Sequence, residues 1–332
     1  MNLSVGDRVG KYEVKKHLGD GSFGFVYLMT DILLNREVAV KFVPNQDPAK
    51  FVEHYEAQIL NQCRHGQIVG VNGVDVTQLA SIGWVAVIDM EYCAEGSVQD
   101  LLQKGCVSIR RALKIMIDVL YGLEHAHRLT ILHRDLKPAN FMVSATGYKL
   151  SDFGLAKSGI AGSGAGSPLY MAPEVFSSNT TNFSTEVFSA GMCLYQLCNN
   201  FIDFASMIPS QQTIKSGGVI RLLGYQEYVP TRLKTICNRA CNVDPAKRYS
   251  SVSEMKQALE KLQVGQDWVR IGVNHWEATV SPRKKHELVG TKNFESSYLV
   301  NGRRKNSACK PFSDLLSMNF YQEQYVAKNT LR

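Results

Sequence analysis

Three short sequence motifs, close together in the middle of the chain, restrict its fold and its chemistry more than any other feature. They are His133-Arg-Asp-Leu-Lys-Pro-Ala-Asn140, Asp152-Phe-Gly154 and Gly166-Ser-Pro-Leu-Tyr-Met-Ala-Pro-Glu174. Phosphoryl transfer needs a base near the acceptor hydroxyl, oxygen ligands for magnesium and a positive charge at the γ-phosphate. The motifs contain groups of all three kinds in one order, so together they predict ATP-dependent phosphoryl transfer.

A glycine-rich segment near the N-terminus fits the same chemistry. It reads Gly19-Asp-Gly21-Ser-Phe-Gly24-Phe-Val26 and lies between two predicted strands. Glycines allow the backbone to approach phosphates and to present N–H groups to them. By itself the segment also fits an ordinary hairpin turn, and a dinucleotide-binding fold would need a helix directly after it, which the sequence lacks.

A lysine in an apolar strand is the next candidate. Lys41 ends the alternating run Val38-Ala-Val-Lys41, where an ammonium group is costly unless it meets anions. We expect it to contact ATP phosphates and a glutamate of the following helix. Glu56 is the stronger candidate partner and Glu53 the weaker; the alternative is a lysine at the sheet edge that extends into solvent.

The hydrophobic pattern predicts an α+β protein with a small β-rich lobe followed by a larger helical lobe. Expected strands cover residues 12–18, 25–30, 37–42, 68–76 and 84–92, and expected helices cover 51–63, 109–127 and 185–197. We place an N-terminal extension at 1–10, a catalytic domain at 11–262 that divides near 92 and 93, and a separate basic module at 263–332.

Composition sets the broad class. The chain has 332 residues, of which 45% are hydrophobic, enough to bury a large core. No apolar run reaches the length of a membrane span, and the N-terminus lacks the apolar stretch of a signal peptide, so we expect a cytoplasmic protein. The eight cysteines form no C-x-x-C pair. They favour reduced core cysteines over a zinc site.

Over about residues 11–262 these motifs resemble those of the eukaryotic-type (Hanks-type) serine/threonine protein kinase superfamily. The resemblance implies a bilobal kinase fold, ATP and Mg²⁺ as cofactors, and a protein as the substrate. It assigns Asp135 as the catalytic base, Lys137 to the γ-phosphate, Asn140 and Asp152 to magnesium, and Lys41, paired with Glu56, to the α- and β-phosphates. Lys137 and the Ser167-Pro168 pair indicate serine or threonine acceptors.

The resemblance also implies an ATP slot. Its predicted lining is Gly19, Gly21, Gly24, Val26, Ala39, Met142, the gatekeeper Met90, and the hinge from Glu91 to Cys93. A pseudokinase that binds ATP without turnover is the alternative, and a missing Lys41, Asp135 or Asp152 would have favoured it. A small-molecule kinase is disfavoured by the segment 166–174, which resembles a platform for protein substrates.

Four further positions follow from the resemblance. Glu174 and Arg248 are expected to form a buried ion pair that ties the activation segment to the large lobe. Glu186 stands where the family usually has the aspartate that anchors the catalytic loop; we expect a shifted anchor and altered activity, without loss. Ser97 and Ala139 are not acidic, which makes a strong preference for basic residues near the phosphosite unlikely.

A regulatory pocket is also predicted. Arg134 and Lys157 could bind a phosphate on the activation segment, at Ser163 or Ser167, added by self-phosphorylation. The alternative is a flexible loop that needs no phosphate, because residues 159–166 are mostly Gly, Ala and Ser.

The last part of the chain is basic. From residue 264 it has eleven Lys/Arg and six Asp/Glu, a net +5 of the total +7. The clusters 283–285 and 303–305, with nearby aromatic residues, could bind nucleic acid; those aromatics are Tyr298, Phe312, Phe320 and Tyr321. We prefer a small module that packs on the large lobe with its charges solvated, with a hairpin at Asn301-Gly302. Its predicted core is Trp268, Val269, Ile271 and Trp276.

Overall fold

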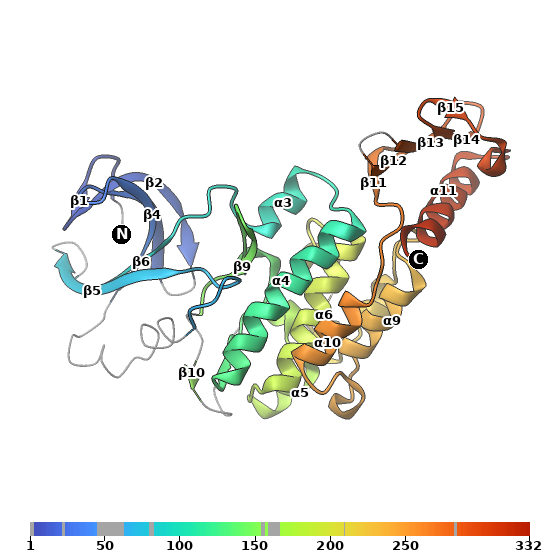
Figure 1. Cartoon of the computed structure of the whole chain (residues 1–332). Coiled ribbons are helices and arrows are strands. Elements are labelled where there is room, and N and C mark those ends of the chain that lie inside the picture. The colour runs from blue at the N-terminus through green and yellow to red at the C-terminus, as the bar shows by residue number, and fades with distance from the viewer. Residues whose placement is uncertain are drawn as a thin grey trace.

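The computed structural model describes residues 3–21, 24–44, 63–79, 83–153, 157–158, 167–208, 210–281 and 284–332. A β-sheet lobe, a helical lobe and a small sheet with one long helix follow one another along the chain (Figure 1). This order confirms the predicted α+β architecture with two lobes and an appended module. A membrane-spanning helix is absent from the part that the structure describes, since none of its helices combines the necessary length and hydropathy.

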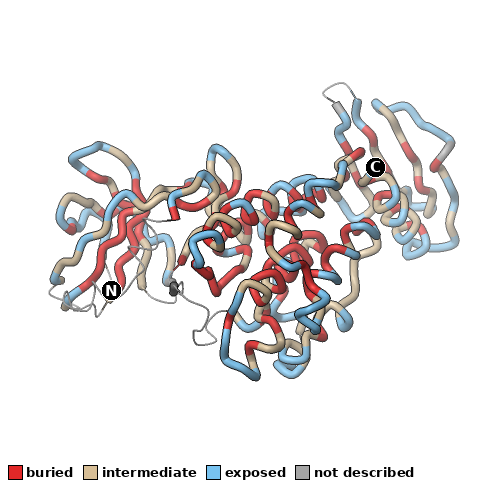
Figure 2. The backbone as a smooth tube through the Cα atoms, turned by 60° about the horizontal axis from the view of Figure 1, so that its bottom comes forward, coloured by how far each residue is buried: buried red, intermediate tan, exposed pale blue. Residues whose placement is uncertain are grey.

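The first lobe is a six-stranded antiparallel sheet in the order β1-β2-β3-β4-β6-β5. Its strands are β1 (Arg8–Val9), β2 (Tyr12–Gly21), β3 (Gly24–Asp31), β4 (Arg36–Pro44), β5 (Val71–Leu79) and β6 (Gly83–Glu91). Tyr27, Met29, Val40 and Phe42 form its core, all at most 2% exposed. Figure 2 shows this buried centre as continuous red strands.

Two local predictions for this lobe need comment. The strand expected near 68–76 begins only at Val71, because Ile68 forms an isolated bridge with Leu150 of the other lobe and is buried there. The helix expected over 51–63 lies outside the described residues except for Cys63, which is buried in a turn.

Helices build the second lobe. They are α3 (Val98–Lys104), α4 (Ile109–Arg128), α5 (Pro173–Ser178), α6 (Phe183–Asn199), α7 (Gln211–Lys215), α8 (Val219–Leu223), α9 (Thr231–Ala240) and α10 (Val252–Glu260). The predicted helices 109–127 and 185–197 are confirmed as α4 and α6. Ser108 caps α4 by accepting a hydrogen bond from the Arg111 N–H, and Asn182 caps α6 in the same way from Thr185.

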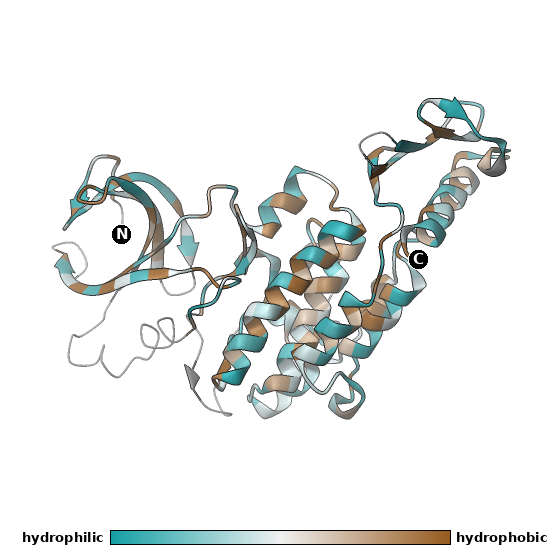
Figure 3. Ribbon diagram, in the orientation of Figure 1, coloured by the Kyte–Doolittle hydropathy of each residue, from teal (hydrophilic) through white to brown (hydrophobic). Residues whose placement is uncertain are grey.

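Helix α6 is the centre of this lobe. Fourteen of its residues are buried, including polar Glu186 and Gln196, so it is covered on all sides. By contrast α4 has an apolar stripe on one face and polar residues on the other, visible in Figure 3 as alternating brown and teal along the helix. The amphipathic α4 therefore packs its apolar face inward against α6.

Short strands carry the sequence motifs. They are β7 (Ile131–Leu132), β8 (Phe141–Ser144), β9 (Gly147–Leu150) and β10 (Lys157–Ser158). β8 and β9 form a hairpin, and β7 pairs with β10. The motif His133–Asn140 lies between β7 and β8, and the motif that begins at Asp152 follows β9. The pairings hold both motifs at the end of the lobe that faces the N-terminal sheet.

The C-terminal module is a second antiparallel sheet packed on one helix. Its elements are β11 (Trp268–Gly272), β12 (His275–Ser281), β13 (Lys284–Gly290), β14 (Glu295–Val300), β15 (Arg303–Arg304), β16 (Lys310–Pro311) and α11 (Leu315–Thr330). Asn301 and Gly302 have φ values of 51° and 73°, the two left-handed residues of a tight hairpin turn between β14 and β15. The predicted hairpin is therefore confirmed.

The predicted core of the module is correct in part. Trp268 and Trp276 are each 3% exposed, whereas Ile271 is 51% exposed and Val269 only half-buried. Successive residues of a strand face opposite sides of the sheet, so Ile271 cannot share a face with Trp268. Treating the alternating Val269 and Ile271 as core was wrong for this reason.

Tyr298 is also buried, with its hydroxyl against His286, so it is not available to stack on a base.

The module packs on the large lobe, as predicted. The Trp276 ring lies 5.2 Å from that of Tyr228. Asp267 accepts hydrogen bonds from the Ser108 hydroxyl (2.9 Å) and the Arg110 N–H (3.0 Å) at the start of α4. Arg232 of α9 donates to the carbonyl of the last residue (2.9 Å). Contacts at three separate points fix the module relative to the helices.

Candidate active site

A cleft of about 810 Å³ lies between the two lobes and contains most of the predicted site residues. Those that line it are Gly19, Val26, Ala39, Lys41, Met90, Glu91, Cys93, Lys137, Asn140, Met142 and Asp152. They come from β2, β3, β4, β6 and the hinge that follows it in the first lobe, and from residues 137–140, β8 and the segment after β9 in the second. The fold thus gathers the motifs into one cavity.

The glycine-rich segment forms the β2–β3 hairpin above this cleft. Gly21 pairs with Gly24, and residues 22 and 23 lie outside the described part. A Cβ on Gly24 would lie 2.0 Å from the carbonyl oxygen of Phe42 on β4. Gly24 is therefore required by the close approach of β3 and β4, a structural reason independent of any phosphate.

The apolar part of the cleft is lined by residues of both lobes. Val26 on β3 and Ala39 on β4 face it from the first lobe, and Met142 on β8 from the second. Met142 is held there by a bridge to Ser97. Burial raises the pKa of the Cys93 thiol to about 11, so this sulfur is neutral at pH 7. The pocket suits a flat aromatic ring such as adenine.

Glu91, the first hinge residue, is fixed by its side chain. Its carboxylate accepts hydrogen bonds from the Lys149 ammonium (2.6 Å) and the Gly70 N–H (3.2 Å). Its own N–H donates to the Gly70 carbonyl (2.8 Å). Because Lys149 belongs to β9 of the second lobe, this ion pair joins the two lobes behind the cleft.

Lys41 joins the lobes inside the cleft. Its ammonium is 2.7 Å from the Asp152 carboxylate, and the residue is only 4% exposed. Burial acts to raise the pKa of Asp152, but the charge and hydrogen bond of Lys41, together with the nearby His133 and Lys137, outweigh burial, and the pKa lies below its usual value. Asp152 has a φ of 61°, a strained conformation for a non-glycine residue. The predicted partner Glu56 lies outside the described residues.

Asp135 is held by three side chains of the catalytic region. One carboxylate oxygen contacts the Lys137 ammonium (2.7 Å) and the Asn140 amide (3.2 Å), and the other accepts from the Ser167 hydroxyl (2.9 Å). Burial acts to raise the pKa of Asp135, but the Lys137 ammonium, the Ser167 hydroxyl and His133 together outweigh burial, and the pKa is lowered. Asp135 is therefore ionised at neutral pH and able to accept a hydrogen bond from an acceptor hydroxyl.

The predicted regulatory residues are only partly described. Ser167 lies in the active site, with its hydroxyl between Asp135 and the Lys137 ammonium (3.1 Å). Arg134 is buried, and burial lowers the pKa of its guanidinium. Ser163 and the side chain of Lys157 lie outside the described part.

Glu186 anchors the catalytic loop despite its additional methylene. It is 2% exposed, and its two oxygens lie 2.6 Å from the Arg134 N–H and 2.6 Å from Nε2 of His127. Arg134 has a φ of 70°, so the anchor holds a strained backbone immediately before Asp135. Sequence reasoning found Glu186 but missed His127, since a single histidine on a helix gives no signal of its partner.

The Glu174–Arg248 ion pair is confirmed. Two guanidinium nitrogens bind the two carboxylate oxygens at 2.6 and 2.8 Å. The Arg248 side chain is fully buried and also donates to the carbonyls of Asn242 and Ser184, while Glu174 is 27% exposed. This bidentate pair ties the end of the segment 166–174 to the first turn of α6.

Oxygen ligands for a hard cation are present in the cleft. Asn140 donates through its amide nitrogen to the Asp135 carbonyl (2.7 Å), which leaves its amide oxygen as an acceptor. Asp152 contacts Lys41 through one carboxylate oxygen, so the other is available as a ligand. An amide oxygen and a carboxylate are donors that Mg²⁺ prefers, and the pair fits that ion.

Comparison with known proteins agrees with this geometry. The sequence profile of the protein kinase domain matches residues 12–262. A probable serine/threonine-protein kinase of Clostridium perfringens is 29% identical over 76% of this chain and 38% of its own length. The serine/threonine-protein kinase PknB of Mycolicibacterium smegmatis is 29% identical, with 77% and 43% covered.

A probable serine/threonine-protein kinase of Streptomyces coelicolor is 31% identical, with 77% of this chain and 40% of its own length covered. The aligned part of the chain thus spans 38–43% of the length of these relatives. The profile nevertheless covers well over half of the present chain, from the first strands to the last helix of the large lobe. On this match, the chain belongs to the protein kinase family.

Proposed function

We propose that the chain is a serine/threonine protein kinase that transfers the γ-phosphoryl group of ATP to hydroxyls of proteins, itself included. The observation that carries the proposal is the contact set around Asp135, with Lys137, Asn140 and Ser167 all within hydrogen-bond distance of its carboxylate. A pseudokinase that binds ATP without turnover does not need these contacts around Asp135.

In this proposal each residue has a defined role. Asp135 orients the acceptor hydroxyl and takes its proton, and Lys137 contributes positive charge beside the transferred phosphoryl group. Lys41 would bind the α- and β-phosphates. Asn140 and Asp152 would hold Mg²⁺, which neutralises charge on the phosphates when bound.

Two substitutions test the proposal. Asp152→Ala removes a magnesium ligand, and we expect the rate to fall on the order of 10²–10³-fold. Asp135→Asn should lower turnover about 10²-fold and leave nucleotide binding nearly unchanged. The assay is transfer from labelled ATP with Mg²⁺ to the protein itself and to a generic protein acceptor. Asp203→Asn, at an exposed carboxylate outside the cleft, is the matched control.

The two functions give different results in this assay. Turnover in the wild type and the control, lost in both cleft variants, supports the kinase. Nucleotide binding without transfer in every protein would identify the pseudokinase instead. Equal transfer by the wild type and by both cleft variants would contradict the assigned roles.

Regulation remains part of the proposal. Arg134 and Lys157 would receive a phosphate on Ser163, which orders the activation segment. For Ser167 the geometry favours a different effect, because a phosphate there would add negative charge beside the Asp135 carboxylate. We therefore expect phosphorylation of Ser167 to inhibit. A cytoplasmic location is also part of this proposal, and for the basic C-terminal module we prefer packing on the large lobe over binding of nucleic acid.

A further inference from the structure

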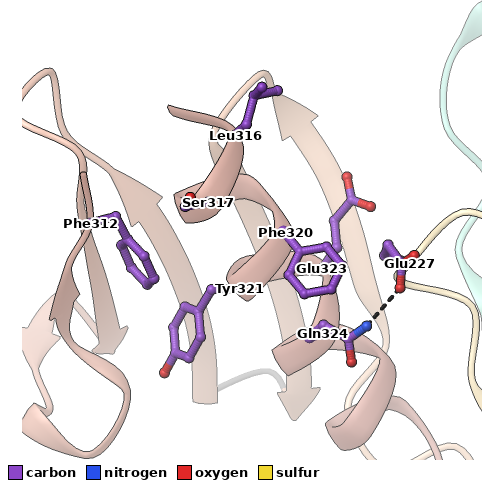
Figure 4. Close-up of a pocket in the computed structure, with 8 residues that line it drawn as sticks. All are labelled: Glu227, Phe312, Leu316, Ser317, Phe320, Tyr321, Glu323 and Gln324. Atoms are coloured by element: carbon purple, nitrogen blue, oxygen red, sulfur yellow. Dashed lines mark hydrogen bonds between the residues drawn. The ribbon is translucent and has the colours of Figure 1, made fainter. Parts of the chain in front are cut away.

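A groove of about 730 Å³ opens between the C-terminal module and the large lobe, away from the catalytic cleft (Figure 4). Seven of its eight lining residues come from the module and one, Glu227, from the loop before α9. Figure 4 shows aromatic side chains from α11 and from the preceding segment directed into it. The lining residues are Glu227, Phe312, Leu316, Ser317, Phe320, Tyr321, Glu323 and Gln324.

Helix α11 has more apolar surface than its own packing requires. Met318, Gln322 and Val326, spaced by four residues, are buried against the sheet of the module. Leu316 and Phe320 lie on a second face and are 80% and 56% exposed. A Leu and a Phe that remain in water on one helix face form an exposed apolar patch of the kind that binds other proteins.

The charge of the groove is opposite to that of the module around it. The module carries a net +5, but the charged residues that line the groove are Glu227 and Glu323, with no Lys or Arg among them. Arg270 is 3.4 Å from Glu323 and compensates one carboxylate. Glu227 accepts a hydrogen bond from the Gln324 amide (2.6 Å) and has no ion pair among the described residues.

This charge decides which class of partner fits. Phosphates of a nucleic acid would meet carboxylates beside the very aromatic side chains that could otherwise stack on bases. A polypeptide with apolar side chains and a nearby Arg or Lys would bury its apolar groups against Phe320 and place its cation at Glu227. The groove thus selects a basic, apolar peptide segment.

Contacts between the module and the large lobe fix the position of the groove relative to that lobe. The Glu227–Gln324 hydrogen bond crosses the boundary between lobe and module at the groove itself, and the Trp276–Tyr228 ring contact lies next to it in sequence.

We propose that this groove is a docking site for a segment of the protein substrate in which Leu or Phe side chains lie next to Arg or Lys, separate from the residue that is phosphorylated. The proposal rests on the protein kinase activity proposed above. Binding at the groove raises the local concentration of the acceptor hydroxyl at the cleft, so it lowers the KM without changing the kcat.

Peptide binding by the full chain tests the site without any catalysis. The probe is a fluorescein-labelled 12-residue peptide of alternating Leu and Arg, measured by fluorescence anisotropy. Two comparison peptides replace Arg by Glu or Leu by Ser. We expect only the Leu/Arg peptide to bind the wild type, with affinity about tenfold weaker in Phe320→Ser and about threefold weaker in Glu227→Gln. Val273→Ser, at a 70% exposed residue outside the groove, is the matched control.

A kinetic measurement completes the test. Fusing the Leu/Arg peptide to a protein acceptor should lower its KM in the wild type and in Val273→Ser but not in Phe320→Ser, with the unfused acceptor unaffected. Equal peptide binding by the wild type and the groove variants, or equal binding of the Leu/Glu peptide, would overturn the proposal. The proposal would also be overturned if the wild type binds no peptide but sediments as a dimer that Phe320→Ser abolishes, because the groove would then bind a second copy of the chain. Specific peptide binding by a chain without kinase activity would refute the proposed function and leave the binding site standing.

Discussion

Replacement of Glu186 is the most informative perturbation of this protein. The carboxylate is buried, and it accepts from a backbone N–H and an imidazole, each at 2.6 Å. Glu186→Ala leaves both donors without this acceptor in a dry interior. A hydrogen bond to a charged group contributes about 1.5–3 kcal/mol, so the free energy of unfolding should fall by about 3–5 kcal/mol.

The conservative change is the sharper one. Glu186→Asp shortens the side chain by one bond, about 1.5 Å, so a carboxylate on the same backbone cannot stay within hydrogen-bond range of both Arg134 and His127. We expect it to keep the Arg134 N–H, lose His127, and lower the free energy of unfolding by about 1.5–3 kcal/mol. In a His127→Ala background, Glu186→Asp should lower the free energy of unfolding by clearly less, because the hydrogen bond to His127 is already absent.

Catalysis should respond through the backbone. Arg134 is strained at a φ of 70° and directly precedes Asp135, so its relaxation would move the catalytic carboxylate. A displacement of about 1 Å costs on the order of 10²-fold in rate, and we expect Glu186→Ala to lower the kcat by about that factor with the nucleotide Kd unchanged.

The measurements are urea unfolding and phosphate transfer on purified variants. Asp203→Asn, at an exposed carboxylate after α6, controls for removal of a charge alone and should change neither quantity. The reasoning is refuted if Glu186→Ala retains wild-type kcat and stability. It is also refuted if the cost of Glu186→Asp is the same with and without His127.

Two further predictions concern ion pairs. Glu174→Gln leaves the buried Arg248 guanidinium without a carboxylate partner. The free energy of unfolding, measured by thermal unfolding, should therefore fall by about 2–3 kcal/mol, and an unchanged Tm would contradict this. Because the Asp152 pKa is lowered in the folded state, its contribution to stability is present at neutral pH and is lost as the pH falls through the lowered pKa. Urea unfolding between about pH 3 and 7 should therefore show a steeper acid loss in the wild type than in Asp152→Asn, and equal slopes would refute it.

The motifs were predictable because their spacing is tied to chemistry. We expected Lys41 to pair with Glu56, and its contact with Asp152, 111 positions away in the chain and 2.7 Å away in space, was not predicted. The Glu174–Arg248 pair was predicted from the resemblance to the kinase family. The hairpin at Asn301 followed from local backbone preferences alone.

Features that depend on tertiary contacts could not be predicted. The exposure of Ile271 depends on which face of β11 meets α11, and alternation alone does not specify that face. The contact of Ser167 with Asp135 depends on how the segment 167–174 folds back over the loop that carries Asp135. Likewise His127 acquires its partner only when α4 packs beside α6.

The first turn of α6 is where the separate anchors of the site meet. Glu186 holds the catalytic loop through Arg134, and the carbonyl of Ser184, two residues earlier, accepts a hydrogen bond from Arg248 (3.1 Å). Arg248 in turn binds Glu174 at the end of the segment that carries Ser167. The Asp135 carboxylate and the segment that contacts it are therefore positioned by one buried helix. Because α6 is covered on all sides, it cannot shift at Ser184 without shifting at Glu186. A substitution that breaks either contact should therefore move the Asp135 carboxylate.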